Sequence, residues 1–429
     1  METKRPPLPE DIRSIYRPRI IDAAISRELS AFGGVLITGP RSCGKSWTGL
    51  MHSRSATFMG YGNINKLAML EPQSALEGEY PHLVDEWQDV PELWDTARRN
   101  IDFGNRKGMY IFTGSSVPQL EKTRHTGIGR FARVEMRTMS LFESGSSSGT
   151  VKLSEVFDTG KAEIARSGMD YRKIVNLICK GGWPGALGLD DEAAMSIPYQ
   201  YMKSVTSTDM LQFDGKRRST TTAKTVLMSL ARNNATLAGD STLATDIRNT
   251  GTAISYPTTA NYVDALKKLY IIDEQAAWHP SLRSRIRIYT SPKRHFTDPS
   301  LAAAVLGARP DILYRDPNAA GFLFESLCYR DLSVYASSMG GSVFHYRDNS
   351  DLEVDAVVQL SDGRWGAAEV KLGASEFDKA ASKLTAFGKK MTMAGAPEPS
   401  FLMILNATGG AAHTRPDGVA EVPIDCLGP

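Results

Sequence analysis

The residues that most clearly predict chemistry form one glycine-rich segment, Gly39-Pro40-Arg41-Ser42-Cys43-Gly44-Lys45-Ser46, which fits the pattern G-x-x-x-x-G-K-[ST]. The apolar run Val35-Leu36-Ile37 before it predicts a buried strand, and the residues from Lys45 to Met51 can begin a helix. A strand, a glycine-rich turn and a helix in this order aim several backbone N–H groups at one point, which suits a phosphate. Lys45 would reach the β- and γ-phosphates, and the Ser46 hydroxyl would ligate Mg²⁺. The pattern predicts a nucleotide site, against the alternative of a chance glycine turn.

Two polar clusters further along the chain could complete an ATPase site. His82-Leu83-Val84-Asp85-Glu86 predicts a strand that ends in two carboxylates, whose side chains point to opposite sides. Asp85 can then hold Mg²⁺ while Glu86 polarises the attacking water. A third strand, from Met109 to Ser115, ends in hydroxyls, so Thr113 or Ser115 would stand beside the γ-phosphate. The alternative is that these residues form ordinary solvated turns.

The predicted nucleotide site therefore combines one loop with the ends of two strands. Its cofactors are ATP and Mg²⁺, and Ser46 and Asp85 are the expected metal ligands. The full set of predicted nucleotide-binding residues is Gly39, Pro40, Arg41, Ser42, Cys43, Gly44, Lys45, Ser46, Trp47, Asp85, Thr113 and Ser115.

An arginine follows the third predicted strand, beside a glycine that lets the backbone approach a neighbour. Arg130, after Gly129, is our candidate for an arginine finger that crosses a subunit boundary, in preference to Arg133. Such a residue stabilises transition-state charge and raises the rate by about 10³–10⁵. The alternatives are an arginine that covers a surface strand, or a finger that acts within its own subunit.

The composition is that of a globular protein with several domains. A length of 429 residues suggests two to three domains, with 41% hydrophobic and 23% charged residues. We expect no signal peptide and no membrane contact, because no apolar run approaches the ~18 residues that span a bilayer. The four cysteines have neither metal nor redox spacing, which predicts a cytoplasmic, reduced protein. They are Cys43, Cys179, Cys328 and Cys426.

Basic residues gather in the middle of the chain. Between Phe213 and Phe296 there are thirteen Lys and Arg against six Asp and Glu. Three predicted helices, at 220–233, 241–247 and 257–269, followed by strands at 269–272 and 286–289, favour a winged helix. We therefore expect nucleic-acid contact through residues 216–294, since phosphate neutralisation supplies most sequence-independent affinity. The alternative is a winged helix that contacts only protein. The cations concerned are Lys216, Arg217, Arg218, Arg283, Arg285, Arg287, Lys293 and Arg294.

The C-terminal region holds a second candidate site on a predicted hairpin. Residues 353–360 and 365–372 alternate around a turn at Asp362, and pairing centred on Asp362 places Asp355 opposite Glu369. Asp355, Glu369 and Lys371 then resemble the D…(D/E)-x-K pattern of nucleases, with Glu325 from an upstream helix completing the metal set. Glu325, Asp355 and Glu369 would bind Mg²⁺ or Mn²⁺, and Lys371 would be catalytic. The alternatives are a solvated surface, or a nuclease fold without activity.

Taken in order, these motifs resemble bacterial and archaeal AAA-type ATPases that carry a C-terminal domain of unknown function. The resemblance also rests on 16–19 (YRPR), 139–143 (MSLFE), 181–185 (GGWPG), 290–296 (TSPKRHF) and 321–325 (GFLFE). It implies an α/β chain with a P-loop AAA-type ATPase domain, a winged-helix region and an α/β restriction-endonuclease-like domain. We place these at residues 1–150, 206–290 and 291–429, with a helical lid or linker at 151–205. Within 151–205, the segment Gly181–Gly185 is either a hinge or a packed structural corner.

Two functions are consistent with these features. The first is an ATP-hydrolysing homo-oligomer, with a hexameric ring as one arrangement, that acts on nucleic acid and carries a metal-dependent nuclease domain. The second is an ATP-operated switch or scaffold that binds protein partners and whose nuclease-like domain is inactive. Catalytic roles fall to Glu86 and Arg130 under both hypotheses, and to Lys371 only under the first.

Overall fold

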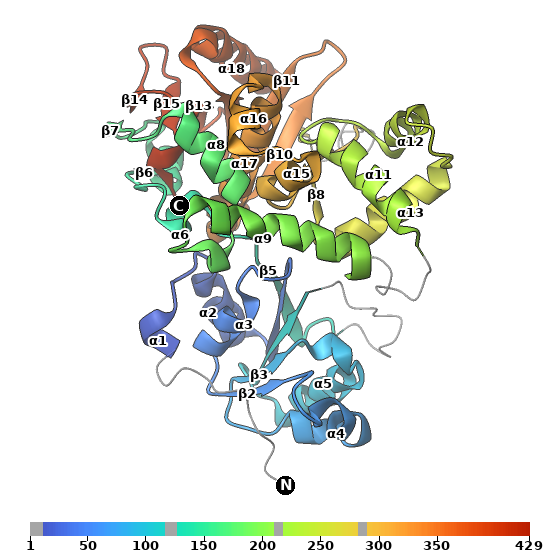
Figure 1. The fold of residues 1–429 in the computed structure, drawn as a ribbon. Coiled ribbons are helices and arrows are strands. Elements are labelled where there is room, and N and C mark those ends of the chain that lie inside the picture. The colour runs from blue at the N-terminus through green and yellow to red at the C-terminus, as the bar shows by residue number, and fades with distance from the viewer. Residues whose placement is uncertain (1–11, 116–126, 210–217, 282–289) are drawn as a thin grey trace. The chain divides into compact units, whose positions relative to one another are not determined.

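The computed structural model describes residues 12–115, 127–209, 218–281 and 290–429. Within these ranges the chain forms two compact units. The first comprises Met1–Thr138 with Lys268–Tyr270, and the second comprises Met139–Lys267 with Ile271–Pro429. In Figure 1 the first unit runs from blue to teal, and the second continues from green to red.

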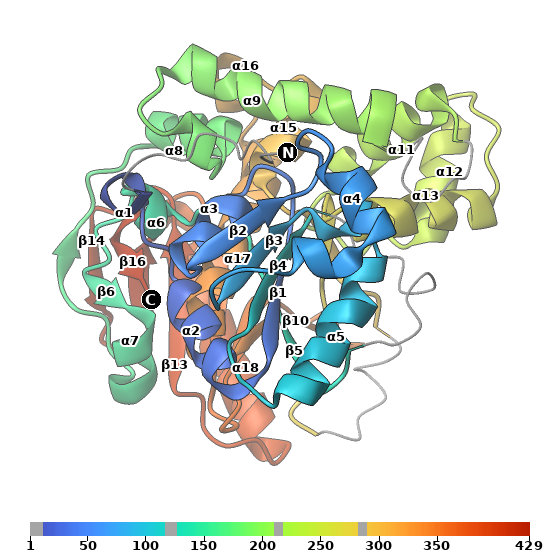
Figure 2. The same cartoon turned by 90° about the horizontal axis from the view of Figure 1, so that it is seen from below.

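The first unit is built on a five-stranded parallel sheet of order β2-β3-β4-β1-β5. Figure 2 shows α2 and α3 on one side of this sheet and α4 and α5 on the other. The strands are β1 (Gly34–Thr38), β2 (Ser55–Phe58), β3 (His82–Asp85), β4 (Tyr110–Gly114) and β5 (Phe131–Glu135). The helices are α1 (Ile12–Ile15), α2 (Asp22–Ala31), α3 (Lys45–Met51), α4 (Ile64–Leu70) and α5 (Glu92–Gly104).

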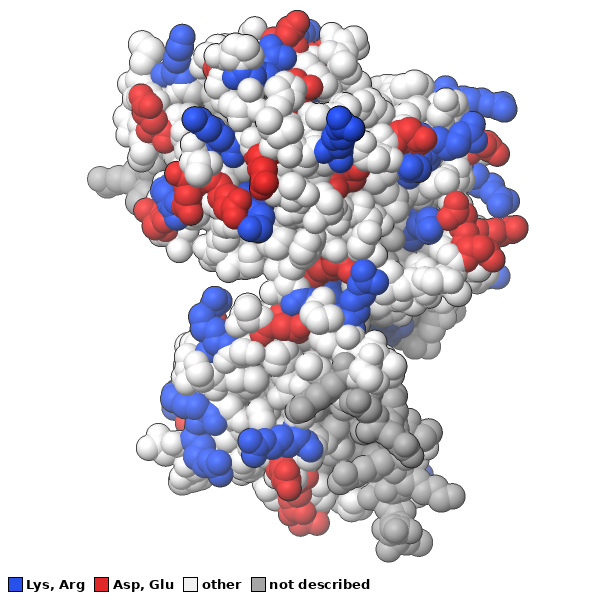
Figure 3. Space-filling model, turned by 90° about the vertical axis from the view of Figure 1, so that its left-hand side faces the viewer, with Lys and Arg blue, Asp and Glu red and all other residues white. Residues whose placement is uncertain are grey.

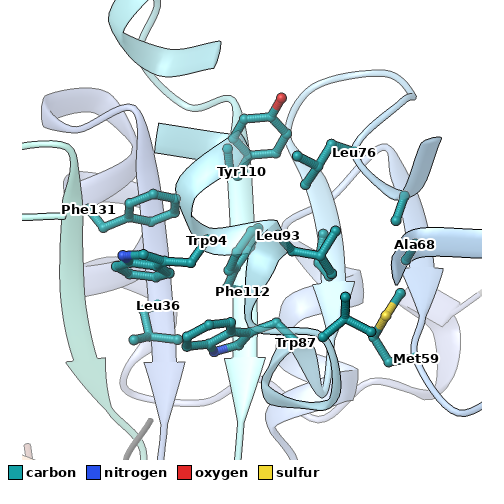
Figure 4. Close-up of a cluster of buried hydrophobic side chains, with 14 of the residues drawn as sticks. Leu36, Met59, Ala68, Leu76, Trp87, Leu93, Trp94, Tyr110, Phe112 and Phe131 are labelled. Carbon is teal, nitrogen blue, oxygen red and sulfur yellow. The ribbon is translucent and has the colours of Figure 1, made fainter. Parts of the chain in front are cut away.

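Successive side chains along each strand point to opposite faces of the sheet and pack into two separate hydrophobic cores, one on each face. Leu36, Val84 and Phe112 point to one face, where they pack with Trp87 and Trp94 (Figure 4). Their chain neighbours, Val35, Ile37, Leu83 and Ile111, pack with α2 on the opposite face. Because both faces are covered, the three central strands, β1, β3 and β4, are buried along their whole length, as parallel strands usually are.

The second unit contains a seven-stranded mixed sheet of order β10-β11-β12-β13-β15-β14-β7. Its antiparallel part is β10 (Ser342–Arg347), β11 (Glu353–Gln359) and β12 (Trp365–Lys371), and its other strands are β13 (Phe401–Asn406), β15 (Ala420–Pro423), β14 (Ala411–Thr414) and β7 (Ala165–Arg166). Helix α17 (Pro317–Ser338) packs against β10, β11 and β12, whereas α18 (Phe377–Met393) packs against β12 and β13. The α18 side buries an apolar core that includes Trp278, Trp365 and Phe387.

Three helices and a hairpin in the second unit have the order of a winged helix. The helices are α11 (Thr220–Arg232), α12 (Asp240–Asn249) and α13 (Tyr256–Lys268), close to the predicted ranges. The hairpin pairs β8 (Ile272–Gln275) with β9 (Lys293–Phe296). This differs from the prediction, because Leu269–Ile271 are not in the first strand and its partner is β9. The predicted strand at 286–289 lies outside the described residues.

The first unit ends at Thr138, before the boundary expected at residue 150, and the residues from Met139 to Lys267 belong to the second unit. The reason is the contacts of α6 (Leu141–Ser144) and the turn after it. Leu141 N donates to Asp331 Oδ2 at 2.9 Å, and Ser147 Oγ donates to Leu427 O at 2.6 Å. Similarly, β6 (Val151–Lys152) pairs with β16 (Leu427–Gly428). Residues 151–205, which we predicted as a lid or linker, therefore belong to the second unit, and their first strand pairs with β16. Their helices are α7 (Leu153–Thr159), α8 (Tyr171–Lys180) and α9 (Asp191–Ser204).

Gly181–Gly185 forms a packed corner. Gly182 N donates to Asp298 Oδ2 at 2.9 Å, and Trp183 Nε1 donates to Ser300 Oγ at 2.9 Å. Trp183 is buried, and Arg330 holds Asp298 through an ion pair of 3.1 Å. The same unit also contains α15 (Pro299–Leu306) and α16 (Pro310–Tyr314). None of the helices in the described ranges combines the length and the apolar run that a bilayer crossing needs.

Candidate functional site

The glycine-rich loop leaves β1 at the carboxyl edge of the first unit's sheet and leads directly into α3. Gly39, Ser42 and Gly44 have φ values of 145°, 59° and 106°. Such positive values favour glycine, and they turn the backbone tightly around one point. A Cβ on Gly39 would lie 2.1 Å from Met136 O, so only glycine fits there. The loop has the tight curvature that a phosphate cradle requires.

Lys45 lies across this loop. Its Nζ donates to Gly39 O at 3.0 Å and to Pro40 O at 2.7 Å, and the residue is only 5% exposed. The ammonium is thus held at the mouth of the loop, where it can meet a phosphate. Of the other predicted loop contacts, Cys43 is buried with its Sγ 3.7 Å from Met136 O, whereas Arg41 and Trp47 are exposed.

Asp85, at the end of β3, is the centre of a buried polar group. Ser46 Oγ donates to Asp85 Oδ1 at 2.8 Å, and Thr113 Oγ1 donates to the same oxygen. Burial raises the pKa of Asp85, and the two hydroxyls and Lys45 oppose that rise. A buried carboxylate beside a serine hydroxyl fits Mg²⁺, which prefers oxygen ligands and shares them with nucleotide phosphates. Ser46 and Asp85 would hold the ion, and Thr113 orients Asp85.

Glu86 is held apart from Asp85 by an unusual backbone. Its φ of 53° is left-handed, which turns its carboxylate away from the strand direction. Ser115 Oγ donates to Glu86 Oε2 at 3.2 Å, and Gln88 Nε2 donates to the same oxygen. The structure therefore brings Glu86 and Ser115 together. It adds Gln88, for which the sequence analysis predicted no role.

A second residue without a predicted role lies before β1. Arg19 is 7% exposed and donates from Nη1 to Cys43 O at 2.9 Å and from Nη2 to Arg137 O at 2.9 Å. It thus joins the glycine-rich loop to the chain that follows β5. Tyr16 reinforces the contact, because its hydroxyl lies 3.0 Å from Thr48 Oγ1 in α3. The motif at 16–19 was the only signal for these roles.

Arg130 lies at the other edge of the sheet. It directly precedes β5, which runs parallel to β1, so a strand length of about 16 Å separates it from the loop edge. Its Nε donates to Asp102 Oδ1 at 2.7 Å, and its side chain is 46% exposed. This position does not fit a finger for the nucleotide site of its own subunit.

The hairpin of the second unit has the predicted register. Ala356 pairs with Ala368 and Gln359 with Trp365, which is the pairing centred on Asp362. A bulge that the alternation did not predict occurs between β10 and β11, where Asp355 and Ala356 together oppose His345. Gln275 fills the bulge by donating from Nε2 to Phe344 O and to Asp355 O, both at 2.9 Å. Bulges re-aim side chains, and this one turns Asp355 toward a cluster of charges.

Three lysines and four carboxylates make up this cluster, which we call the carboxylate–lysine cluster. Its members are Lys293, Glu325, Glu353, Asp355, Glu369, Lys371 and Lys383. Lys371 lies 3.0 Å from Glu369 and 3.7 Å from Asp355, so it bridges the two predicted metal ligands. Burial raises the pKa of Glu369, against the effect of Lys371 and Lys383.

The predicted metal set of Glu325, Asp355 and Glu369 does not fit a divalent ion in this arrangement. The Lys293 ammonium lies 2.7 Å from Glu325 Oε1 and 3.7 Å from Asp355 Oδ1, and Lys371 and Lys383 contact the two oxygens of Glu369. Across the described residues, no group of three or more Asp, Glu, His or Cys side chains could hold a metal ion. The expected cation position is taken by amines of the chain itself.

The predicted basic face also changes in the structure. Arg218 is buried and donates to Asn261 Oδ1 at 3.0 Å, and Arg294 pairs with Asp240 at 2.7 Å. Lys293 belongs to the carboxylate–lysine cluster. The remaining cations, Lys216, Arg217, Arg283, Arg285 and Arg287, lie outside the described residues. Figure 3 shows a different side of the molecule, the left-hand side of Figure 1, and there positive and negative side chains of the described residues are interspersed.

Three protein families match successive parts of the chain. Residues 32–144 match a family described as an AAA domain. Residues 171–312 and 320–427 match two families, each described as a domain of unknown function (DUF8612 and DUF4143). The chain therefore carries an AAA-type P-loop ATPase domain and a separate C-terminal α/β domain of unknown function, which confirms the expected family resemblance.

Relatives over most of the chain share modest identity. Uncharacterized proteins of Mycobacterium bovis and Mycobacterium tuberculosis are each 25% identical over 359 residues, which covers 81% of this chain and 72% of each relative. Among solved structures, the Walker-type ATPase PABY2304 of Pyrococcus abyssi is 16% identical at a TM-score of 0.44, covering 68% of this chain and 97% of its own. AMPPCP-bound DnaA from Aquifex aeolicus is 11% identical at a TM-score of 0.26, covering 61% and 89%. At such scores the two likenesses carry no weight for function.

Proposed function

We propose that the first unit binds ATP with Mg²⁺ and hydrolyses it. The observation that supports this most strongly is the convergence of Ser46, Asp85 and Thr113 beside the glycine-rich loop, joined by hydrogen bonds through one carboxylate oxygen. These three residues come from α3, β3 and β4, so three separate elements meet at the carboxyl edge of the sheet. Ligands of open α/β sheets bind at that edge.

Each residue of the site then has a distinct task. Lys45 exchanges its loop carbonyls for the β- and γ-phosphate oxygens, and Ser46 and Asp85 hold Mg²⁺. When bound, Mg²⁺ neutralises charge on the phosphates. Glu86 orients the attacking water and receives its proton, while Ser115 and Gln88 fix the Glu86 carboxylate. Since phosphoryl transfer depends mainly on positioning and electrostatics, such fixed partners are what the reaction needs.

We propose Arg130 as a residue that completes this site in a neighbouring copy of the chain, within a homo-oligomer. Its position at the amino-terminal edge of the sheet supports action in trans. Ile128, two residues before Arg130, is 79% exposed, and Phe103, next to its partner Asp102, is 88% exposed. Aromatic side chains and arginine are enriched at protein interfaces.

We further propose that ATP hydrolysis controls how the protein binds its partners. The carboxylate–lysine cluster favours a protein that binds partners without cutting nucleic acid, because amines occupy the position expected for a metal. Contact with nucleic acid through residues 216–294 stays a proposal that rests on sequence, since most of the cations concerned lie outside the described residues. Stimulation of ATP hydrolysis by DNA or RNA would support it.

ATP binding and turnover should separate in two variants. Lys45→Ala should lose ATP binding because the phosphate contact is lost, whereas Glu86→Gln should bind ATP but cease turnover. Glu92→Gln, an exposed glutamate in the first turn of α5, is the matched control and should hydrolyse ATP normally. Binding is measured by titration with a fluorescent ATP analogue, and turnover by phosphate release. Normal hydrolysis by Glu86→Gln would show that the role given to Glu86 is wrong.

A further inference from the structure

One lysine amine in the second unit sits among three carboxylates with almost no exposure to solvent. Lys293 Nζ lies 2.7 Å from Glu325 Oε1, 2.7 Å from Glu353 Oε1 and 3.7 Å from Asp355 Oδ1, and its side chain is 2% exposed. The carboxylates come from α17 and β11, whereas the lysine comes from β9. Three chain segments thus converge on one ammonium group.

Two further carboxylates of the cluster, Asp355 and Glu369, also lie beside lysine amines. Asp355 Oδ2 accepts a hydrogen bond from Val370 N at 2.9 Å and lies 3.7 Å from Lys371 Nζ. Glu369 is held between Lys371 at 3.0 Å and Lys383 at 2.7 Å. Four carboxylates therefore face three ammonium groups, and the Arg347 guanidinium lies 3.8 Å from Glu353 Oε2, which leaves little net charge to attract a further cation.

We propose that Lys293 is a built-in cation that excludes divalent metal from the carboxylate–lysine cluster, so that the C-terminal domain does not catalyse metal-dependent cleavage. The nuclease pattern requires a divalent ion at these carboxylates, but the Lys293 amine lies there instead. Mg²⁺ requires near-octahedral oxygens at about 2.0–2.1 Å, and the amine occupies the oxygens that such an ion would use. A divalent ion beside the ammonium would also meet like charge in a poorly solvated site.

Lys293 is not free to move aside. Its backbone belongs to β9, where Lys293 pairs with Gln275, and Gln275 in turn fills the bulge at Asp355. Burial alone would lower the pKa of the Lys293 amine. The carboxylates of Glu325, Asp355 and Glu353 outweigh burial and raise this pKa above its usual value, so the amine stays charged. Displacing this charge would leave the carboxylates buried without a partner, which is strongly unfavourable.

The test is Mn²⁺ binding to the nucleotide-free 429-residue chain, measured by electron paramagnetic resonance of the free Mn²⁺. Wild type and Lys267→Met should bind alike, since Lys267 pairs with Glu274 outside the cluster. Lys293→Met should gain one Mn²⁺ per chain, with an affinity at least about tenfold above any wild-type binding. Weak Mn²⁺ binding at the glycine-rich loop would be the same in wild type, Lys267→Met and Lys293→Met, so it does not affect the comparison.

A double variant keeps the test decisive if Lys293→Met does not fold. Lys293→Met with Glu325→Gln removes one charge of each sign and leaves Glu353 and Asp355 as ligands, so it should fold and gain the Mn²⁺ site. The proposal is overturned if this variant folds and binds no more Mn²⁺ than wild type. It is also overturned if wild type binds Mn²⁺ and loses it in Asp355→Asn, or cleaves DNA or RNA with Mn²⁺ in a way that Asp355→Asn abolishes. These outcomes do not depend on ATP hydrolysis by the first unit.

Discussion

Thr113 illustrates how a single hydroxyl supports the nucleotide site. It is fully buried, donates to Asp85, and accepts from Glu86 N at 3.4 Å. One side chain therefore connects the predicted metal ligand to the predicted water-orienting residue. Removing a hydrogen-bond donor from a buried carboxylate typically lowers the free energy of unfolding by about 1–3 kcal/mol.

Thr113→Val should therefore keep ATP binding and lower turnover by about ten- to a hundredfold, because Asp85 loses its orientation. The Mg²⁺ concentration that gives half-maximal hydrolysis should also rise. Thr96→Val, at a half-buried threonine on α5, is the control of the same chemistry and should leave both quantities unchanged. An unaltered Mg²⁺ dependence in Thr113→Val would contradict the orienting role.

Arg19 holds the glycine-rich loop by donating to one carbonyl of the loop and to one carbonyl after β5. Arg19→Lys should weaken ATP binding about tenfold, because an ammonium cannot reach Cys43 O and Arg137 O with the planar fork of a guanidinium. Arg27→Lys, on α2 with a side chain 60% exposed, serves as the control. Equal ATP affinity in both variants, measured by titration, would show that Arg19 does not position the loop.

At the scale of elements, the connection from β1 to α3 depends on close approach to the segment after β5. Met136 N donates to Thr38 O at 2.7 Å, which brings Met136 O against Gly39. The loop is thus shaped partly by the segment that follows β5, about a hundred residues further along the chain.

Gly39→Ala should abolish ATP binding and destabilise the first unit, since the new Cβ would lie 2.1 Å from Met136 O. Gly129→Ala separates this clash from backbone strain. Gly129 has a φ of 78°, but nothing lies within 4 Å of an added Cβ, so only the strain of about 1–2 kcal/mol applies. The measurements are thermal unfolding and ATP titration, and similar losses in the two variants would refute the steric explanation.

The elements also show what could be predicted from sequence. The glycine-rich loop, the carboxylates after β3 and the hydroxyls after β4 follow from local patterns, because strand ends and turns have local signatures. The pairing of β11 with β12 was predictable for the same reason, since the turn at Asp362 fixes its register. The bulge at Asp355 was not, because it depends on Gln275 from a distant strand.

At the scale of the whole chain, long-range contacts account for most differences from the prediction. Residues after Thr138 join the second unit through Asp331 and Leu427, and no local pattern signals these partners. The same holds for Lys293, which sequence reasoning assigned to a basic face for nucleic acid. Its burial among carboxylates follows from the packing of β9, β11 and α17, and only the fold brings these elements together.

Assembly is the remaining property of the whole molecule, and Arg130 provides its test. If Arg130 acts in a neighbouring copy, ATP hydrolysis per subunit should rise with protein concentration, and Arg130→Ala should lower it by about 10³-fold or more. Mixing Arg130→Ala with Glu86→Gln should restore activity, because some interfaces then combine an intact Glu86 site with an intact Arg130. Arg98→Ala is the control, since Arg98 pairs with the same Asp102 but is not proposed to reach a neighbour. Hydrolysis by a monomer at a rate independent of concentration would exclude a role in trans. Because a strand length separates Arg130 from the loop of its own subunit, that result would leave Arg130 as a surface partner of Asp102.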